Sequence, residues 1–232
     1  QHFYNELAKP SKPDAASLSA KSIKNIHGVL HKALKQAVLI GYLRTNPTEA
    51  CILPRIIRKE MHPLEEDQVA VFLREVQGHP HEYLYKIALF TGLREGEVLG
   101  LGWEHIDFQA GTLTVKRQLR REQKKGGEYY FSPPKNNKSR CLTLAPSVIQ
   151  LFRLQKLEQN SMRMEAGDAW EEHGLIFTNQ TGGYLSYRTV YDCFKRIVRN
   201  IGAPATRFHD LRHTFAVASI KSGDDIKTVQ EN

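Results

Sequence analysis

Apolar residues recur at helical spacing early in the chain. After Ser17 they lie three or four residues apart and so share one face of a helix, namely Ile23, Ile26, Leu30, Leu34 and Ala37. Gly41 is the expected end of this helix, and Asn46-Pro47 is typical of a cap followed by the first turn of another helix. The pattern predicts a small helical domain.

A second domain is expected after residues 53–63, which carry proline near both ends and mixed charge between, as a linker does. We place the domains at residues 1–58 and 59–232. Apolar spacing then predicts helices around residues 69–76 and 81–90, the second ending at Thr91-Gly92. A further helix starts directly after Arg94, so this side chain lies beside backbone N–H groups that favour anions.

Three short runs of β-type residues interrupt the helices, at residues 112–115, 128–132 and 141–144. Pro133-Pro134 and the polar residues 135–139 form the expected turn before the last run. Helical patterns resume after Pro146, from about Ser186 to Asn200, and through residues 208–223. The predicted fold class is α+β and mainly helical, with a helical domain followed by a mixed α/β domain that holds a small antiparallel sheet.

The last of these helices begins with FHDLRHTFA at residues 208–216. His209 and His213 are four residues apart and Arg212 is three after His209, so all three share one face of the helix. The apolar stripe of this helix is expected to be Leu211, Phe215 and Ala218. The helix therefore presents two imidazoles and a guanidinium away from its buried side.

Positive charge is unevenly distributed along the chain, whose formal net charge is +8. Residues 1–58 hold nine Lys or Arg against three Asp or Glu, a net of +6, whereas residues 59–232 hold 24 against 22, a net of +2. Within the second part, residues 116–140 again carry nine basic residues against Glu122 and Glu128. Basic surfaces on two domains indicate a clamp around a nucleic acid.

Other features narrow the class of protein. No run reaches the ~18 apolar residues of a membrane span, and the N-terminus has no signal-peptide pattern, so we expect a soluble cytoplasmic protein without a membrane partner. The three cysteines, Cys51, Cys141 and Cys193, are scattered and free of any CxxC pair. Their spacing argues against a disulfide framework and against a structural zinc site.

Four side chains that are cationic, or become so on protonation, come from distant segments and lie beside turns or helix ends: Arg94, Lys135, His209 and Arg212. Phosphoryl transfer requires such a set, because arginines stabilise charge on the phosphate oxygens while a lysine or histidine delivers or relays a proton.

Each of these residues alone has a simpler interpretation. Arg94 could pair with Glu95 or Glu97, and Lys135 could be a plain phosphate contact. His213 is best interpreted as a partly buried support of its helix. Two histidines at i and i+4 also match zinc helices, but the neighbouring glutamate of metalloproteases is missing and Arg212 would place a positive charge beside the metal. We therefore disfavour a metal site.

Three segments together resemble the tyrosine recombinase family, the phage and transposon integrases: TGLREGEVLGL at 91–101, PPKNNKSRCLTL at 133–144 and HDLRHTFA at 209–216. The resemblance covers most of residues 64–232, and residues 17–50 look like the core-binding domain of that family. It implies that Arg94 and Arg212 are catalytic arginines, Lys135 a catalytic hairpin lysine and His209 the catalytic histidine. Glu97 matches a family acid that orients the site.

The resemblance also implies a reaction. A tyrosine hydroxyl attacks DNA and forms a 3′-phosphotyrosine, which a 5′-hydroxyl of a partner strand then attacks, with no metal or nucleotide cofactor. The implied partner is a double-stranded DNA recombination site of a mobile element in a bacterial cytoplasm. The resemblance implies that the two domains close around the duplex as a C-shaped clamp and that the protein works as a dimer or tetramer. The basic residues expected to contact DNA are Lys21, Lys24, Lys32, Lys35, Lys138 and Arg140.

The sequence departs from the family at two places. The family usually has threonine after the catalytic lysine, whereas Asn136 follows Lys135 here, so Lys138 is the substitute candidate. The family places its nucleophilic tyrosine after the HxLRH helix, whereas Tyr184, Tyr187 and Tyr191 precede it and are expected to pack or to contact DNA. We therefore expect a fragment that ends before the nucleophile, begins without an arm-binding domain, and binds DNA without cutting it.

Two alternatives stay open at this point. A type IB topoisomerase-like enzyme would use the same chemistry to relax supercoils as a monomer. A non-catalytic DNA-binding clamp would keep the fold, although phosphate binding alone places no demand on a His-x-x-Arg helix.

Overall fold

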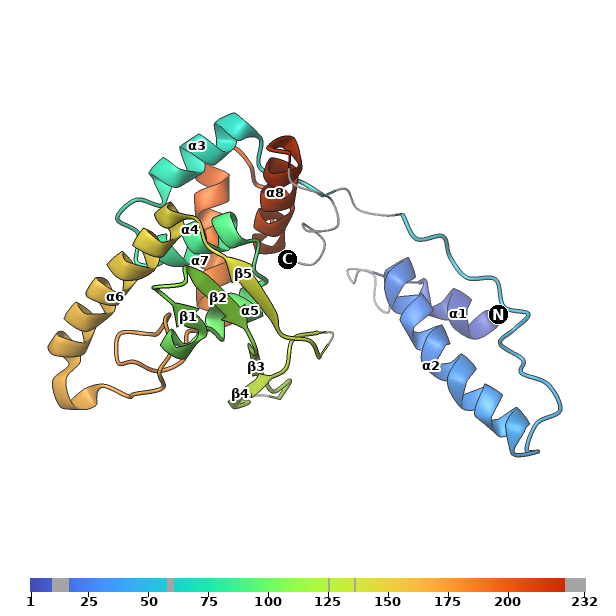
Figure 1. The fold of residues 1–232 in the computed structure, drawn as a ribbon. Coiled ribbons are helices and arrows are strands. Elements are labelled where there is room, and N and C mark those ends of the chain that lie inside the picture. Colours follow the sequence, from blue (N-terminus) through green and yellow to red (C-terminus); the bar gives the residue numbers. More distant parts are fainter. Residues whose placement is uncertain (10–16, 58–60, 125, 136, 224–232) are drawn as a thin grey trace. The chain divides into compact units, whose positions relative to one another are not determined.

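The computed structural model describes residues 1–9, 17–57, 61–124, 126–135 and 137–223 (Figure 1). The chain divides into two compact units, Gln1–Glu60 and Met61–Asn232. The strands that the structure describes all belong to the second unit.

The first unit is built on two helices, α1 (His2–Leu7) and α2 (Ala20–Leu39). Ser19 begins α2, because its hydroxyl accepts the Ser22 N–H at 3.1 Å. The predicted helix is confirmed, and its apolar face is the least exposed one, with Ile23 fully buried and the other four apolar positions half-buried. Helix α1 was not predicted, since six residues are too few to establish a periodicity.

Asn46-Pro47 begins a turn, where the sequence predicted a second helix. The Asn46 Oδ1 atom accepts the Thr48 N–H at 3.1 Å and the Thr48 hydroxyl at 2.6 Å, and residues 47–50 have turn geometry. An Asn side chain that satisfies nearby backbone groups competes with helix formation, which explains the difference.

The second unit has five longer helices around one apolar core: α3 (Glu66–Glu75), α4 (Glu82–Thr91), α6 (Pro146–Ala166), α7 (Tyr187–Asn200) and α8 (Phe208–Lys221). Helix α4 is central, and the ring of its Tyr85 lies 6.5 Å from that of Phe72 on α3, 5.8 Å from Phe194 on α7 and 6.2 Å from Phe208 on α8. The predicted helices of this unit are confirmed, among them the short α5 (Glu95–Leu99) after Arg94, and the described residues add two short 3-10 helices, η1 (Trp103–His105) and η2 (Gly167–Ala169).

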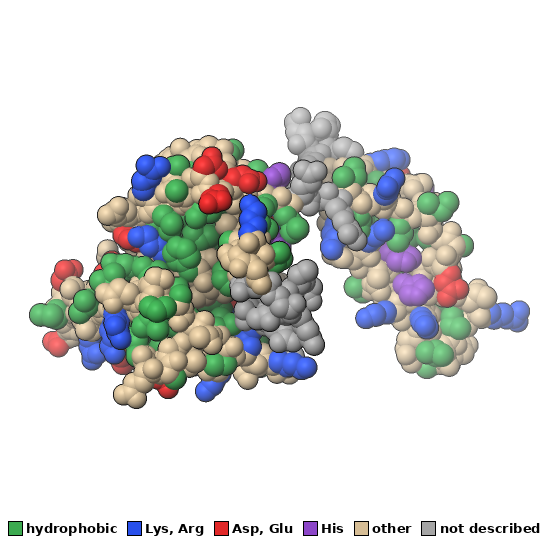
Figure 2. Space-filling model, turned by 45° about the horizontal axis from the view of Figure 1, so that its top comes forward, with side chains coloured by type: hydrophobic (Ala, Val, Ile, Leu, Met, Phe, Trp, Pro, Cys, Tyr) green, Lys and Arg blue, Asp and Glu red, His purple; other side chains and the backbone are tan. Residues whose placement is uncertain are grey.

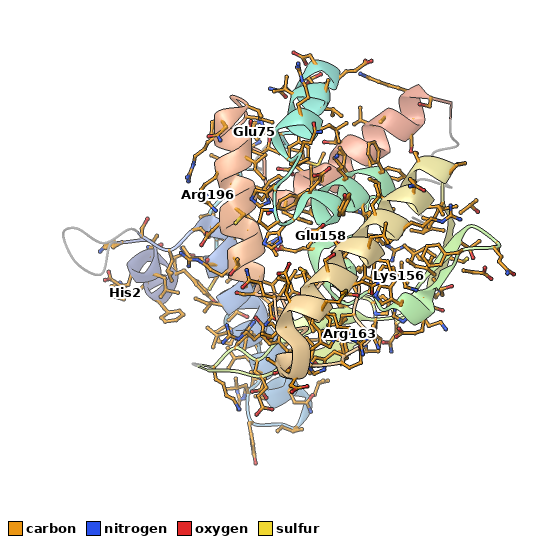
Figure 3. All side chains as sticks on the ribbon, turned by 90° about the vertical axis from the view of Figure 1, so that its left-hand side faces the viewer. His2, Glu75, Lys156, Glu158, Arg163 and Arg196 are labelled. Carbon is orange, nitrogen blue, oxygen red and sulfur yellow. The ribbon has the colours of Figure 1, made fainter. Side chains whose placement is uncertain are left out.

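Helices α3 and α7 also lie side by side, as Glu75 and Arg196 mark in Figure 3. The Asn200 amide of α7 donates to the Glu75 carboxylate of α3 at 2.8 Å.

The described strands form two small antiparallel sheets, where one was predicted. The first has the order β1 (Ile106–Asp107), β2 (Thr112–Val115), β5 (Arg140–Thr143), and the second pairs β3 (Gln118–Arg121) with β4 (Tyr129–Ser132). In the first sheet Leu113 is opposite Leu142, and both are buried. Strand β3 has the sequence QLRR, without a β-branched or aromatic residue, so composition did not predict it.

Strand β3 packs closely on α5 because that helix ends in glycine. A Cβ atom on Gly100 would lie 2.7 Å from the backbone nitrogen of Leu119, which is closer than two non-bonded atoms approach each other. Glycine thus permits a contact that any larger residue would block. The contact fixes the β3–β4 hairpin beside the helix that begins at Arg94.

In Figure 2 the Lys, Arg, Asp and Glu side chains are scattered over the visible surface among hydrophobic side chains. Among the helices that the structure describes, none is long and apolar enough to cross a membrane.

Candidate active site

Arg94 is placed by a sharp turn between two helices. Helix α4 ends at Gly92, whose φ of 63° is left-handed, and Arg94 is the residue before the first turn of α5. The Arg94 N–H donates to Glu97 Oε2 at 2.9 Å, so the Glu97 side chain folds back and caps the helix. The predicted position of Arg94 at a helix start is confirmed.

Glu97 is a buried carboxylate held by two guanidinium groups. Only 1% of its side chain is exposed. Arg94 Nη1 donates to Glu97 Oε1 at 2.9 Å, and Arg140 donates to both carboxylate oxygens at 3.0 and 2.8 Å. Burial alone would raise the pKa of Glu97, but these hydrogen bonds and the Arg140 charge outweigh it and lower the pKa to about 2.

The guanidinium of Arg140 lies at the Glu97 carboxylate, a place that the sequence analysis did not assign to it. We expected it to contact DNA from the surface, but its side chain is only 16% exposed and its guanidinium is bound to Glu97. Residue positions alternate across a strand, so Arg140 shares a side of β5 with the buried Leu142. That alternation is a signal in the sequence that could have placed Arg140 in the site.

Arg212 comes to the same place from α8. Its Nη1 donates to the Gly92 carbonyl at 2.6 Å, which ties α8 to the turn before Arg94. Burial and the nearby charges of Arg94 and Arg140 lower the pKa of Arg212. The structure thus brings Arg94, Arg140 and Arg212 together around Glu97.

His209 lies beside this arginine cluster. Burial of part of the ring, then His213, Arg212 and Arg94, lower the pKa of His209, so its imidazole is neutral at pH 7. The His213 ring is 5.0 Å from the His209 ring and at 85° to it. Within the described residues, no group of three or more His, Cys, Asp or Glu side chains is arranged to hold a metal ion.

Helix α8 is fixed by polar residues that the sequence analysis did not assign. Asp210 is fully buried and accepts the Arg207 N–H at 2.9 Å and the Arg207 guanidinium at 3.0 and 2.8 Å. The Thr214 hydroxyl accepts the Leu64 N–H at 2.9 Å. The spacing Arg207-x-x-Asp210 before an apolar residue is a capping signal in the sequence that could have revealed Asp210.

These contacts also shift the buried side of α8. Leu211 is buried as predicted, but Phe215 is half-buried and Ala218 is exposed, whereas Thr214 is buried. The predicted apolar stripe is therefore buried at Leu211, half-buried at Phe215 and exposed at Ala218, and Thr214 on the same face is buried with its hydroxyl bonded to the Leu64 N–H.

Lys135 and Lys138 are both exposed, and among the described residues neither makes a contact with the arginine cluster. They lie in the connection from β4 to β5, which belong to different sheets. The predicted hairpin turn is thus a crossing between two sheets. The structure keeps both lysines near strand β5, the strand that begins at Arg140.

The remaining predicted residues fall into two groups. The lysines Lys21, Lys24, Lys32 and Lys35 are exposed on α2 of the first unit. Of the three tyrosines, Tyr187 donates its hydroxyl to the Leu119 carbonyl and is partly buried. Tyr184 stacks on Tyr129 with ring centres 5.3 Å apart, and Tyr191 is 40% exposed.

The turn that carries the Arg212 contact yields a stability prediction. Gly78 and Gly92 both have left-handed φ, 74° and 63°. A Cβ on Gly92 would lie 2.5 Å from Phe215 Cδ1, whereas one on Gly78 would have nothing within 4 Å. We expect Gly78→Ala to cost about 1 kcal/mol and Gly92→Ala about 2–4 kcal/mol in urea unfolding. Equal costs would contradict the close contact with Phe215.

The phage integrase family matches this chain over residues 62–232. The Tyrosine recombinase XerC-like protein of Caldanaerobacter subterraneus subsp. tengcongensis is 29% identical over 247 residues, covering 100% of this chain and 62% of that protein. An integrase of Streptomyces ambofaciens is 28% identical over 212 residues, covering 87% of this chain and 53% of the relative. The chain thus spans between half and two thirds of the length of these relatives.

Solved structures give a similar result. The Tn1549 transposon integrase in complex with transposon right end DNA matches with a TM-score of 0.78 and 25% identity, over 92% of this chain and 71% of that one. The XerH site-specific recombinase bound to its difH substrate matches with a TM-score of 0.62 and 23% identity, over 92% and 58% of the two chains. The second likeness supports the fold alone.

Proposed function

The chain belongs to the phage integrase family, and we propose that it is the DNA-binding and catalytic part of a site-specific recombinase that cuts and rejoins DNA through a 3′-phosphotyrosine. One observation carries the proposal: the guanidinium groups of Arg94 and Arg140 hold the single carboxylate of Glu97, and burial with the nearby charges of those two arginines lowers the pKa of Arg212 beside them. Such a cluster has excess positive charge in a partly desolvated place, which favours a phosphate anion.

Two of the three arginines, Arg94 and Arg212, have the same task in this proposal. Arg94 and Arg212 donate to the non-bridging oxygens of the scissile phosphate and stabilise the charge that grows there in the transition state. The mutual repulsion that lowers the pKa of Arg212 is relieved when the phosphate binds. Glu97 and Arg140 touch no substrate atom in this account; Glu97 positions Arg94, and Arg140 completes its hydrogen bonding.

His209 is the third phosphate partner. A neutral imidazole at pH 7 donates one hydrogen bond to a phosphate oxygen and accepts a proton at its other nitrogen. The charge of the phosphate would raise the pKa of His209 again, because it offsets the neighbouring arginines. His213 supports this ring from the next turn of α8.

The reaction exchanges one phosphate ester for another. The tyrosine oxygen forms a bond to phosphorus, the bond from phosphorus to the 5′ oxygen breaks, and that oxygen takes up a proton from Lys135. The tyrosine proton leaves to a nearby base, and no residue of this chain is assigned as the tyrosine. Rejoining runs the same steps in reverse with the 5′-hydroxyl of another strand, so the bond energy is retained.

The wider assignments follow from this role. We propose that residues 1–58 form a core-binding domain and residues 59–232 the catalytic domain. The substrate is a double-stranded DNA recombination site, and the working state is a homo-oligomer on DNA in the cytoplasm. The remaining exposed lysines, on α2 and at Lys138, contact DNA phosphates.

The test is to trap the covalent intermediate. The intact recombinase is incubated with a nicked, radiolabelled duplex that carries its recombination site, in EDTA, and run on a denaturing gel. We expect a protein-linked DNA band that forms without added metal. If DNA binds in a mobility shift but no band forms, the chain is a non-catalytic clamp and the proposal fails.

Lys135 is tested by rescue. Lys135→Ala should slow cleavage of ordinary DNA by about 100-fold or more, because general-acid catalysis is lost. A substrate with sulfur in place of the leaving 5′ oxygen should restore the rate, since a thiolate leaves without a proton. Lys138→Ala is the matched control, exposed in the same connection. Rescue of Lys138→Ala instead would transfer the role to Lys138.

A further inference from the structure

Glu95 is a carboxyl group that the proposed mechanism leaves unused. It is the first residue of α5 and follows Arg94 directly. Its Oε1 atom is buried and has no hydrogen-bond partner among the described residues. The guanidinium of Arg94 is bound to Glu97. A buried carboxylate without a cation or a donor is strongly unfavourable, whereas the uncharged acid is much less so.

Two tyrosine hydroxyls lie within electrostatic range of Glu95, and neither has a proton to give it. The charge of Glu95 acts on Tyr85 of α4 and on Tyr187 of α7. Tyr85 donates its hydroxyl proton to the Val190 carbonyl at 2.8 Å. Tyr187 donates its own to the Leu119 carbonyl. Each oxygen can therefore only accept a further hydrogen bond, which a protonated carboxyl can donate and a carboxylate cannot.

Among the described residues, no cation offsets the burial of Glu95. The other titratable groups that act on the two tyrosines are Cys193, Arg196, Arg120 and Tyr129. None of these four acts on Glu95 itself, whose pKa burial raises to about 7. Below that pH the side chain is mostly the uncharged acid, and above it a charge appears inside the fold.

The first turn of α5 is packed closely against its neighbours. A Cβ atom on Gly96 would lie 2.7 Å from the Tyr187 hydroxyl oxygen and 3.1 Å from the Leu119 carbonyl oxygen. Glycine therefore lets Tyr187 reach across the helix to strand β3. A charge at Glu95 gains hydrogen-bond donors only if this turn moves toward solvent, and Arg94 moves with it because the two residues are consecutive.

We propose that Glu95 is a positioning residue of the active site. As an uncharged acid it seats the first turn of α5 on α4 and α7 and keeps Arg94 in place, and loss of its proton releases the turn and slows strand cleavage. The inference rests on the proposed function and adds control of that site by pH. Glu95 and Glu97 thus hold Arg94 in opposite protonation states, one neutral and one ionised.

DNA binding should favour the protonated form of Glu95. The scissile phosphate that docks on Arg94 adds negative charge beside the first turn of α5, and this charge repels an ionised Glu95. The pKa of Glu95 is therefore higher in the complex than the value of about 7 in the free chain. The complex binds more protons than its free components above that pH, so the affinity for DNA falls as pH rises there.

The first experiment measures the pH profile of cleavage. The intact recombinase forms the covalent complex with a nicked, radiolabelled duplex under single-turnover conditions. The wild-type rate should fall by about tenfold per pH unit on the alkaline side. Glu95→Gln keeps an uncharged group of the same shape, so its rate should stay within about threefold of the wild type on the acidic side and should lose the alkaline fall.

The matched control is Glu66→Gln. Glu66 is the first residue of α3, as Glu95 is of α5, but its side chain is exposed. This variant removes a carboxyl from the same place on a helix without removing a buried one. It should keep the wild-type profile.

The second experiment titrates the group itself and needs no catalysis. The side-chain carboxyl of Glu95 is followed by carbon-13 NMR in the unaltered 232-residue chain as the pH is changed. We expect a midpoint near pH 7, well above the ordinary value of 4.5. A midpoint at the ordinary value would overturn the inference even if cleavage depends on pH.

The outcomes separate this inference from the function on which it rests. If the wild type forms the complex but Glu95→Gln keeps the same alkaline fall, Glu95 has no positioning role and the recombinase proposal stands. If Glu95→Gln loses cleavage equally at every pH, the residue is merely structural and the inference fails. If the wild type forms no complex at any pH, both are overturned.

Discussion

Arg212→Ala in the intact recombinase should reduce formation of the protein-DNA covalent complex by about 10³–10⁵-fold, the range found for a single arginine that stabilises a phosphoryl transition state. The reason is the geometry: Arg212 is half-buried, tied to the Gly92 carbonyl, and held against the repulsion of two other arginines. DNA affinity should fall by less than about tenfold, since many other lysines and arginines contact phosphates. Single-turnover cleavage of a radiolabelled duplex and a mobility shift measure the two effects.

The control for this change is Arg163→Ala. Arg163 is labelled on α6 in Figure 3, and its ion pair among the described residues is with the exposed Glu172 at 3.1 Å, so its loss removes the same charge outside the cluster. Its cleavage rate should stay within about twofold of the unaltered protein, the scale of surface changes. If Arg212→Ala instead lost binding and cleavage in equal measure, Arg212 would be a docking residue and not a catalytic one.

Glu97→Gln should lower the free energy of unfolding at pH 7 by about 3–5 kcal/mol, because it leaves two guanidinium groups without their buried countercharge. The effect should depend on pH with a defined sign. The pKa of Glu97 is about 2 in the folded state, below its ordinary value of 4.5, so the unfolded chain binds the proton first as pH falls. The wild type therefore loses about 3 kcal/mol of stability between pH 4.5 and pH 2, and the variant lacks this loss.

Glu95, on the same helix, provides a control of opposite sign. Burial raises its pKa to about 7, so the folded protein keeps the proton while the unfolded chain releases it, and stability falls as pH rises from 4.5 to 7. Glu95→Gln should remove that fall. Urea unfolding of the 232-residue chain at several pH values measures both variants. If the difference in free energy of unfolding between the wild type and Glu97→Gln did not change with pH, Glu97 would not be an ionised partner of the arginines.

Helices of the second unit could be predicted from the sequence because their apolar residues recur with a strong period. The same period placed the buried face of α2, and the glycine signal placed the end of α4 at Thr91-Gly92. The three motifs also placed Arg94 and Arg212, since each lies next to a turn or cap whose chemistry is local. Signals of this kind depend on neighbouring residues alone, so the packing of distant segments does not change them.

Residues whose positions depend on distant partners were the ones missed. Arg140 was read as a surface contact because its partner, Glu97, is 43 residues away in the sequence. The burial of Thr214 on α8 was missed because it depends on a hydrogen bond from the backbone N–H of Leu64, 150 residues away. Strand β3, and with it the pairing of β3 with the predicted β4, was missed because packing against Gly100 favours β3 more than its own composition does.

The hydrogen bond from the Leu64 N–H to the Thr214 hydroxyl has a consequence for the order in which the site is completed during synthesis. A ribosome adds about 5–20 residues per second, so the 150 residues between these two groups take about 8–30 s to appear. During that interval α3 and the Arg94 turn are outside the ribosome without α8, and the arginine cluster lacks Arg212. A nascent chain therefore has no complete arginine cluster until its last described helix arrives.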